Sequence, residues 1–430
     1  MAEFEPIAAR NDAGEQIEAE LLIVGGGIAG MTAAIETAEL GKKVILVERS
    51  PSLGGRVIAS NQYFPKLCPP TCGMEINLKR MRSNPNVRIL TLAEVGGVSG
   101  SPGDLQVQIK LNPRYVNEKC TCCGECAKAC EIERENDFNY GIDRTKAIYL
   151  PHLMAYPHRY VVDPRHARNE SMKKCVEACA YDAIDLDMQP RTITAKVRAI
   201  VWATGWKPYD ATNLENLGFG KYRNVITNVM MERYASENGP TQGKIVRPSD
   251  GGGIGKIGFV QCAGSRDENH LPYCSSICCL ASMKQATYVR NQYPDAEVHI
   301  FYIDLRAPGR MEDFYTKVKG DEKCFFHRGK VGKITQGSGD NVVLEAENTL
   351  TGQITRTEVD LAVLATGMVP NTAQDPPPLG TALDEFGFIA PDRREGVIGA
   401  GVAVRPVDVA MSVQDATGAV LKALIAGARR

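Results

Sequence analysis

Residues 20–48 read ELLIVGGGIAGMTAAIETAELGKKVILVE. The apolar run LLIV leads into a glycine turn, and small and apolar residues then follow up to a second apolar run, KVILVE. Two short apolar runs on either side of a helix-length segment are typical of a strand, a helix and a second, parallel strand. The stretch therefore predicts a βαβ unit and an α/β fold.

The glycine turn has the spacing G-x-G-x-x-G at Gly25, Gly27 and Gly30. In this motif the first glycine permits a tight turn, the second lets the backbone approach a pyrophosphate, and the third lets the helix pack closely on the strand. Glu48 ends the second strand about 20 residues later, where a carboxylate can accept hydrogen bonds from ribose hydroxyls. These features predict a dinucleotide site, with a purely structural glycine turn as the alternative.

Similar patterns recur along the chain. The run KIGFVQCAG at 256–264 predicts another strand and turn, and the runs VWATG and LAVLATG both end in Ala-Thr-Gly. The repetition predicts two related α/β domains, the first of which is interrupted by a cysteine-dense segment. We expect a first dinucleotide domain at 1–115, 191–250 and 371–430, an insertion at 116–190, and a second Rossmann-like domain at 251–370.

Charge and composition narrow the class of protein. The 430 residues include 50 basic and 51 acidic side chains, so no nucleic-acid partner is expected. The N-terminal stretch has no apolar signal segment and no long apolar run occurs, so we expect a cytoplasmic chain that meets a membrane only through partners. Fourteen cysteines occur in clusters, which favours metal or redox chemistry over a disulfide scaffold.

The first cysteine group follows the C-x2-C-x2-C-x3-C run of bacterial ferredoxins. The last cysteine of that run often ligates a second cluster, and the first cluster takes its fourth ligand from the other half of the fold. The other half here holds only two cysteines, because Asn169 and Met172 fill the remaining positions. We expect one 4Fe-4S cluster on Cys120, Cys123, Cys126 and Cys179. Cys130 as the fourth ligand and a structural zinc site remain alternatives.

The second cysteine group lies at a strand end and a helix start. It comprises Cys262, Cys274, Cys278 and Cys279. A helix N-terminus favours thiolates, so we expect a second, irregular 4Fe-4S site, with a redox-active dithiol or buried inert thiols as alternatives. Cys68 and Cys72 leave a dithiol, a cluster edge and simple packing equally open.

The flavin assignment rests on resemblance to flavoproteins with two dinucleotide-binding domains, the disulfide and thioredoxin reductases. Leu53-Gly54-Gly55-Arg56 resembles their second FAD-contacting loop, and both Ala-Thr-Gly runs resemble turns that pass the cofactor. Where those proteins usually have Gly-Asp, this chain has Gly399-Ala400-Gly401. The residues that the resemblance assigns to FAD are Gly55, Arg56, Thr204, Gly205, Gly367 and Gly401.

The flavin motif, the ferredoxin-like run and QCAGSRDENHLPYCSSICC at 261–279 together resemble the A subunits of heterodisulfide reductase. The resemblance implies an α/β flavoprotein with two dinucleotide-binding domains, a disulfide- or thioredoxin-reductase-like fold, and an inserted ferredoxin-like α+β segment. It implies an oxidoreductase that moves electrons between FAD and iron–sulfur centres. Unlike many such subunits, this sequence has no C-terminal two-cluster ferredoxin segment.

The run NQYFPKLCPPTCGMEIN at 61–77 resembles the A subunits of the quinone-interacting membrane-bound oxidoreductases of sulfur metabolism. That resemblance implies three partners, which are a further flavin and iron–sulfur subunit, a membrane haem subunit, and adenylylsulfate reductase. It also implies a place on the inner face of the membrane and electron exchange with the quinone pool. A soluble heterodisulfide-reductase-type subunit, with flavin-based bifurcation, and a stand-alone disulfide oxidoreductase are the alternatives. No catalytic residue is assigned.

The second domain predicts weak or absent binding of NADH and NADPH. Its strand ends in Phe259-Val260-Gln261-Cys262-Ala263-Gly264, where a nucleotide domain would carry G-x-G-x-x-G. Without those glycines the backbone cannot approach a pyrophosphate closely. Calorimetric titration with either nucleotide should show no binding in the micromolar range, and micromolar affinity would contradict this reading.

Overall fold

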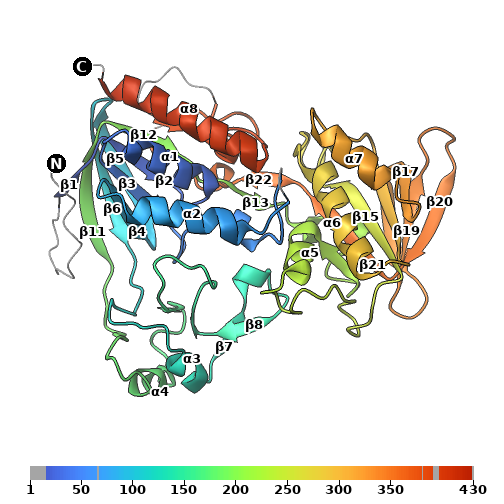
Figure 1. The fold of residues 1–430 in the computed structure, drawn as a ribbon, viewed down its shortest axis with the longest axis horizontal. Helices are drawn as coiled ribbons and strands as arrows, with labels where there is room; N and C mark the ends of the chain where they lie inside the picture. The colour runs from blue at the N-terminus through green and yellow to red at the C-terminus, as the bar shows by residue number, and fades with distance from the viewer. Residues whose placement is uncertain (1–15, 65–66, 380, 391–396, 429–430) are drawn as a thin grey trace.

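The computed structural model describes residues 16–64, 67–379, 381–390 and 397–428 (Figure 1). Two α/β lobes lie side by side, and a smaller segment that carries α3 and α4 extends from the first lobe. This arrangement agrees with the predicted fold class of two α/β domains and an insertion.

The first lobe is built on a five-stranded parallel sheet in the order β23-β12-β2-β3-β4. Its residues alternate between two cores, since Leu21 and Ile23 pack toward the helices while Leu22 packs toward a second sheet. The strands are β2 (Leu21–Val24), β3 (Val44–Glu48), β4 (Val87–Thr91), β12 (Ala199–Trp202) and β23 (Val397–Gly399). The helices on the first face are α1 (Ile28–Glu39), α2 (Pro70–Arg82) and α8 (Val409–Ala428).

A four-stranded sheet in the order β1-β11-β6-β5 covers the other face. Its strands are β1 (Gln16–Glu18), β5 (Ala93–Ser101), β6 (Asp104–Leu111) and β11 (Arg191–Val197). The insertion leaves the lobe after β6 and returns at β11, and these two strands are antiparallel neighbours with Leu111 opposite Arg191. A long segment can therefore extend outward without any break in the sheet.

The insertion is small and has its own core, which includes Cys126, Cys130, Met172 and Cys175. Its helices are only one or two turns long. Its elements are α3 (Glu125–Ala129), α4 (Met172–Glu177), β7 (Glu133–Glu135), β8 (Arg144–Lys146), β9 (Ile148–Tyr149) and β10 (Val161–Val162).

The second lobe has a five-stranded parallel sheet in the order β14-β21-β15-β16-β17 and a three-stranded antiparallel sheet. The parallel strands are β14 (Val225–Thr227), β15 (Lys256–Ala263), β16 (Glu297–Tyr302), β17 (Cys324–Arg328) and β21 (Leu361–Thr366). The antiparallel strands are β18 (Val331–Gln336), β19 (Val342–Glu347) and β20 (Ile354–Val359), and the helices are α5 (Asn228–Ala235), α6 (Cys278–Gln292) and α7 (Met311–Lys319).

The boundary between the lobes differs from the division expected at residue 250. Strand β14 pairs in parallel with β21, and α5 packs in the same core, so both belong to the second lobe. The chain crosses between the lobes earlier, at β13 (Trp206–Pro208), which pairs with β22 (Met368–Pro370). A three-residue strand carries too little periodicity for the sequence to indicate its partner.

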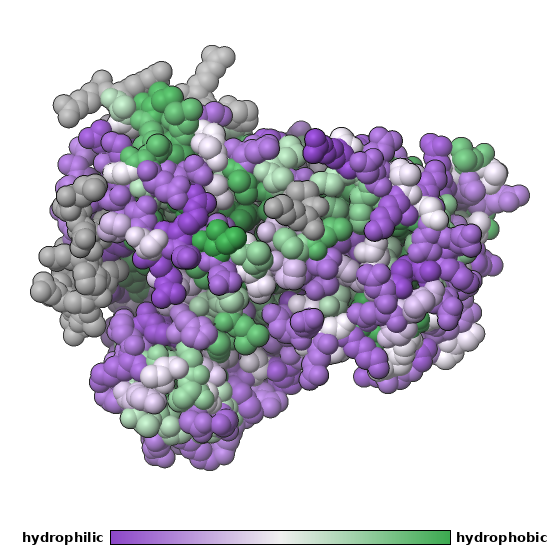
Figure 2. All heavy atoms as spheres, in the orientation of Figure 1, coloured by the Kyte–Doolittle hydropathy of each residue, from purple (hydrophilic) through white to green (hydrophobic). Residues whose placement is uncertain are grey.

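Helix α8 is long and apolar enough, by length and composition, to cross a membrane, with a mean hydropathy of 1.3. Core helices of soluble proteins meet the same criteria, so this is weak evidence of a span. One face of α8 packs into the first lobe through Ala416, Ala419 and Ala423. The other face exposes apolar side chains, including Leu421 and Ile425, and Figure 2 shows apolar atoms gathered over this helix.

Arg233 of α5 is fully buried and joins three parts of the chain. Its guanidinium donates to the side-chain oxygen of Asn139 in the insertion at 2.7 Å and to the carbonyl of Ala59 in the first lobe at 3.1 Å. It also bonds Asn238 and lies over the ring of Phe138, 4.6 Å from its centroid. Because every partner is buried or part-buried, this residue fixes the insertion against both lobes.

Replacing Arg233 by Met should lower the free energy of unfolding by about 3 kcal/mol, because several buried acceptors lose their donor. Chemical denaturation measures the change. The matched control is Arg356→Met, whose parent side chain is 73% exposed and pairs with Glu345, and it should change stability by less than about 0.5 kcal/mol. Equal effects of the two substitutions would contradict the anchoring role.

Candidate functional site

The glycine turn after β2 leaves no room for side chains at two of its glycines. A Cβ atom at Gly25 would lie 2.3 Å from the carbonyl oxygen of Ala203, and one at Gly30 would lie 1.7 Å from the carbonyl oxygen of Gly25. Gly27 faces Gly55, whose Cα atom is 3.8 Å from a Cβ placed at Gly27. The turn therefore forms the close backbone cradle at the N-terminus of α1 that a pyrophosphate requires.

Glu48 ends β3 beside this turn. Its carboxylate accepts hydrogen bonds from the N–H groups of Gly26 at 2.5 Å and Ser50 at 2.6 Å. A carboxylate has about four lone-pair positions, so each oxygen can still accept a ribose hydroxyl. The residue thus lies where the sequence motif requires an acceptor.

The loops after Leu53 and after β12 meet at the same side of the sheet. The Nε atom of Arg56 donates to the carbonyl of Trp206 at 3.1 Å. Gly205 has a φ of +69°, which favours glycine. The Thr204 hydroxyl is buried and has no hydrogen-bond partner among the described residues. A buried hydroxyl without a partner fits a site completed by a polar ligand such as FAD.

The last two predicted flavin residues lie in different places. Gly401, with a φ of +61°, lies against α1, since a Cβ there would be 3.1 Å from the Cβ of Ala29. A Cβ at Gly367 would instead lie 2.3 Å from the Ser265 hydroxyl and 2.9 Å from the Ser275 hydroxyl. Gly367 is therefore beside the second cysteine group, and its contact with FAD stays a prediction.

In the second lobe, the turn after β15 corresponds to the glycine turn of the first lobe, and a side chain occupies its space. Cys262 has a φ of +57°, and the ring of Tyr209 occupies the space beside Gly264, 2.7 Å from a Cβ placed there. Helix α6 begins only at Cys278. A pyrophosphate would therefore find no open glycine cradle at this strand end, although the N-terminus of α6 lies in the same recess as Cys262.

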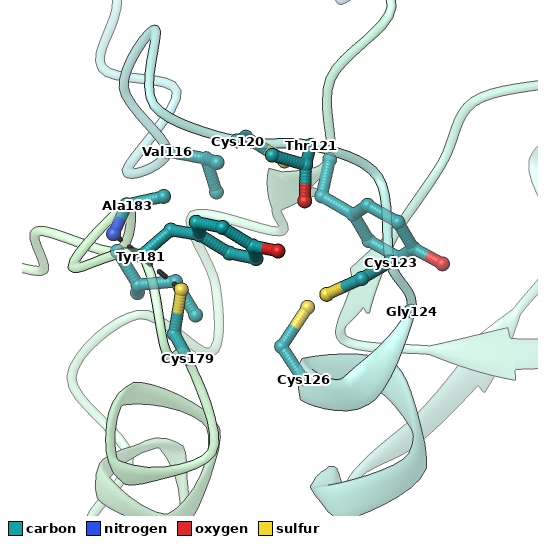
Figure 3. A pocket seen from close by; sticks show the side chains of 11 residues that line it. Val116, Cys120, Thr121, Cys123, Gly124, Cys126, Cys179, Tyr181 and Ala183 are labelled. Atoms are coloured by element: carbon teal, nitrogen blue, oxygen red, sulfur yellow. Dashed lines mark hydrogen bonds between the residues drawn. The ribbon is translucent and has the colours of Figure 1, made fainter.

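The first cysteine group lines a recess in the insertion (Figure 3). Cys123, Cys126 and Cys179 turn their sulfur atoms toward one shared space, and the ring of Tyr181 lies beside it. The cysteines that line the recess are Cys120, Cys123, Cys126 and Cys179, the four predicted ligands of the first cluster. Cys130 does not line it. Cys130 lies with Cys175 in the insertion core, and its thiol donates to the carbonyl of Ile132 at 3.5 Å.

Burial and the neighbouring Cys120 raise the pKa of the Cys126 thiol to about 12. Such a thiol is protonated at neutral pH, so it gains a charge only beside a strong cation such as iron. The backbone N–H of Ala183 donates to the sulfur of Cys179 at 3.4 Å. The donor set therefore fits a thiolate-ligated metal better than a reactive dithiol.

The second cysteine group lines another recess, at the carboxyl ends of β15 and β16. All four predicted ligands, Cys262, Cys274, Cys278 and Cys279, line it. Burial raises the pKa of Cys262 and Cys279, and raises that of Cys278 well above its usual value. Raised pKa values disfavour the dithiol alternative, because the reactive species in thiol exchange is the thiolate.

Three charged residues also line this recess, and none of them was singled out from the sequence: Arg266, Asp304 and Arg306. Asp304 and Arg306 follow β16, which is the parallel neighbour of β15. The carboxyl ends of neighbouring parallel strands meet at one edge of a sheet. This rule could have indicated from the sequence that residues after β16 lie near Cys262.

Among the described residues, no three potential ligands are close enough together to hold a single metal ion. The case for iron therefore rests on the composition of the two recesses and on the cysteine spacing. Cys68 and Cys72 line neither recess, and the backbone N–H of Tyr63 donates to the carbonyl of Cys68 at 3.2 Å.

Packed side chains connect the flavin turn to the second recess. The side-chain amide of Asn371, just after β22, donates to the carbonyl of Thr204 at 2.6 Å. Between the two sites lies an apolar cluster that includes Trp206, Tyr273 and Val402. The Tyr273 hydroxyl donates to the carbonyl of Met368 at 2.8 Å. The two sites are therefore neighbours that share one wall of packed side chains.

Known proteins resemble this chain over most of its length. Residues 20–72 match the profile of the family described as FAD dependent oxidoreductase. The iron–sulfur A subunit of a CoB–CoM heterodisulfide reductase from Methanopyrus kandleri is 38% identical over 94% of this chain and 64% of the relative. The A subunit of the H2:CoB-CoM heterodisulfide,ferredoxin reductase from Methanothermobacter marburgensis is 35% identical over 95% and 64%. The chain thus spans slightly less than two thirds of these relatives.

Solved structures support the fold alone. Thioredoxin reductase from Lactococcus lactis matches with a TM-score of 0.54 and 16% identity over 96% of this chain and all of that one. The enzyme from T. acidophilum matches with a TM-score of 0.52 and 16% identity over 95% and 98%. These likenesses confirm the predicted thioredoxin-reductase-like architecture.

Substituting Cys179 by Ala should remove the iron bound by the insertion, because this sulfur lines the first recess. Cys130→Ala should leave the iron content unchanged, since Cys130 lies outside the recess. Iron and acid-labile sulfide analysis of anaerobically purified protein measures both. Loss of iron in the Cys130 variant together with retention in the Cys179 variant would reverse the assignment of the fourth ligand.

Proposed function

This chain is homologous over nearly its whole length to the A subunits of heterodisulfide reductases, and we propose that it is an electron-transfer subunit that holds FAD and two 4Fe-4S clusters. The observation that carries the proposal is the pair of recesses, each lined by four cysteines, on a flavoprotein fold. The second recess shares a wall with the flavin turn, which supports direct exchange between the two sites.

Each part of the chain has a distinct task in this proposal. When bound, FAD accepts electrons in pairs and releases them singly, and iron–sulfur clusters accept one at a time. The glycine turn and Glu48 hold the nucleotide, and Arg56 and Thr204 line the same side of the sheet. The eight recess cysteines supply thiolates.

Partner proteins, rather than a nicotinamide nucleotide, deliver or remove the electrons in this proposal. Support comes from Tyr209, whose ring fills the space beside Gly264 at the turn after β15. A hydride donor therefore has no place at the turn where nucleotide domains bind it.

The finer role is electron exchange between the quinone pool and adenylylsulfate reductase in dissimilatory sulfur metabolism. In this role the chain lies on the cytoplasmic face of the membrane and binds two further subunits, one with flavin and iron–sulfur clusters and one with haem in the membrane. The run at 61–77 supports this role by resemblance. Identity to heterodisulfide reductase subunits favours the second candidate, which is a soluble protein of that type with flavin-based bifurcation.

Replacing Cys262 by Ala should leave FAD bound and remove about half of the iron. The flavin turn lies on the other lobe, whereas Cys262 lines the second recess. Flavin and iron are measured separately, from the visible spectrum and by chemical analysis. Iron equal to that of the unaltered protein would refute the second cluster, and a protein with flavin but no iron at all would support a disulfide oxidoreductase.

Affinity purification of the tagged chain from its native host separates the two partner proposals. The quinone-linked role predicts both electron transfer to adenylylsulfate reductase and co-purification with a haem-containing membrane protein. Co-purification with soluble heterodisulfide reductase subunits would contradict it and support the second candidate.

A further inference from the structure

The two cysteine recesses differ in charge. The first is lined by no charged side chain among the described residues. The second is lined by Arg266, Arg306 and Asp304, which together carry a net positive charge. Both recesses use four cysteines, so the surroundings rather than the ligands distinguish them.

Arg266 is one of two arginines that line the second recess. Its side chain lines the recess together with Cys262 and is paired with the Asp304 carboxylate. Its backbone N–H donates to the Tyr273 carbonyl at 3.1 Å, which holds the residue in a left-handed conformation with φ +55°. Only 27% of its side chain is exposed, so solvent screens its charge incompletely.

Other groups of the recess surround the remaining sulfur atoms. The backbone N–H of Ser276 donates to the Cys274 sulfur at 3.3 Å, and the Cys279 thiol donates to the carbonyl of Asp304 at 3.7 Å. The Arg306 guanidinium lies 3.4 Å from the Asp304 carboxylate, so one carboxylate is shared by two cations. The neighbouring Asp267 is neutralised by Lys330 at 2.6 Å.

Reduction adds negative charge to an iron–sulfur cluster, so cations and N–H donors at its sulfurs stabilise the reduced form and raise its potential. We propose that Arg266, supported by Arg306, makes the second recess the higher-potential of the two iron–sulfur sites. Arg266 acts as a positioning residue and not as a ligand. This inference rests on the proposed function and adds to it the order of the two reduction potentials.

The proposal has a consequence for electron flow. Electrons that reach the flavin pass preferentially to the second recess, which shares a wall with the flavin turn. The first recess, in the insertion, is then the stronger reductant. Charge thus gives the two otherwise similar sites different places in one electron path.

Redox titration of the full chain, followed by electron paramagnetic resonance, tests the order. Before titration, iron and sulfide analysis establishes whether both clusters are present. In the unaltered protein the second site, identified by its loss in Cys262→Ala, should have the higher midpoint potential. Equal potentials, or a lower one at the second site, would overturn the inference while leaving the proposed function intact. Absence of iron–sulfur signals would overturn both.

Substitutions that remove a positive charge and a negative charge distinguish an effect of charge on the potential from an effect of structural damage. Arg266→Gln should lower the second midpoint, Arg266→Lys should keep it near its original value, and Asp304→Asn should raise it, with the first site unmoved in all three. The matched control is Arg356→Gln, an exposed ion-paired arginine on β20, which should shift neither site. A midpoint unmoved by Arg266→Gln, or shifted alike by Arg266→Gln and Asp304→Asn, would overturn the role of charge.

Discussion

The short pairing of β13 with β22 is the contact on which the relation between the two sites depends. Each strand follows an Ala-Thr-Gly turn, and the pairing of Trp206 with Pro370 fixes the two turns against each other. Asn371 then returns two hydrogen bonds to Thr204 and Gly205. The turns belong to different sheets, yet these contacts hold them side by side, so the flavin turn and the second recess are neighbours.

The local parts of the fold were predictable from sequence because their physics is local. The βαβ unit follows from the two apolar runs and the length of the segment between them, Gly25 has a φ of +110° that favours glycine, and Gly30 is required by a contact within the turn itself. The cysteine spacing placed three candidate ligands on one segment. The choice of Cys179 over Cys130 depended on the two-half pattern of ferredoxins; Cys179 lines the first recess and Cys130 lies in the insertion core, and ligation by Cys179 stays a prediction.

Features that depend on the order of strands were not predictable. The two Ala-Thr-Gly turns are identical in sequence, but one lies at the glycine cradle and the other at the second recess, since the pattern carries no information on which sheet it joins. Asp304 and Arg306 reach the second recess only because β16 is the neighbour of β15. The lobe boundary shifted for the same reason, because β14 is held by pairing with β21.

The insertion begins and ends on strands that already pair, with Leu111 opposite Arg191. A tight turn between those two residues would close an ordinary hairpin and leave the sheet complete. The insertion is therefore structurally separable: the first lobe could close without it, while Arg233 supplies the contact that gives the inserted segment a fixed place against both lobes.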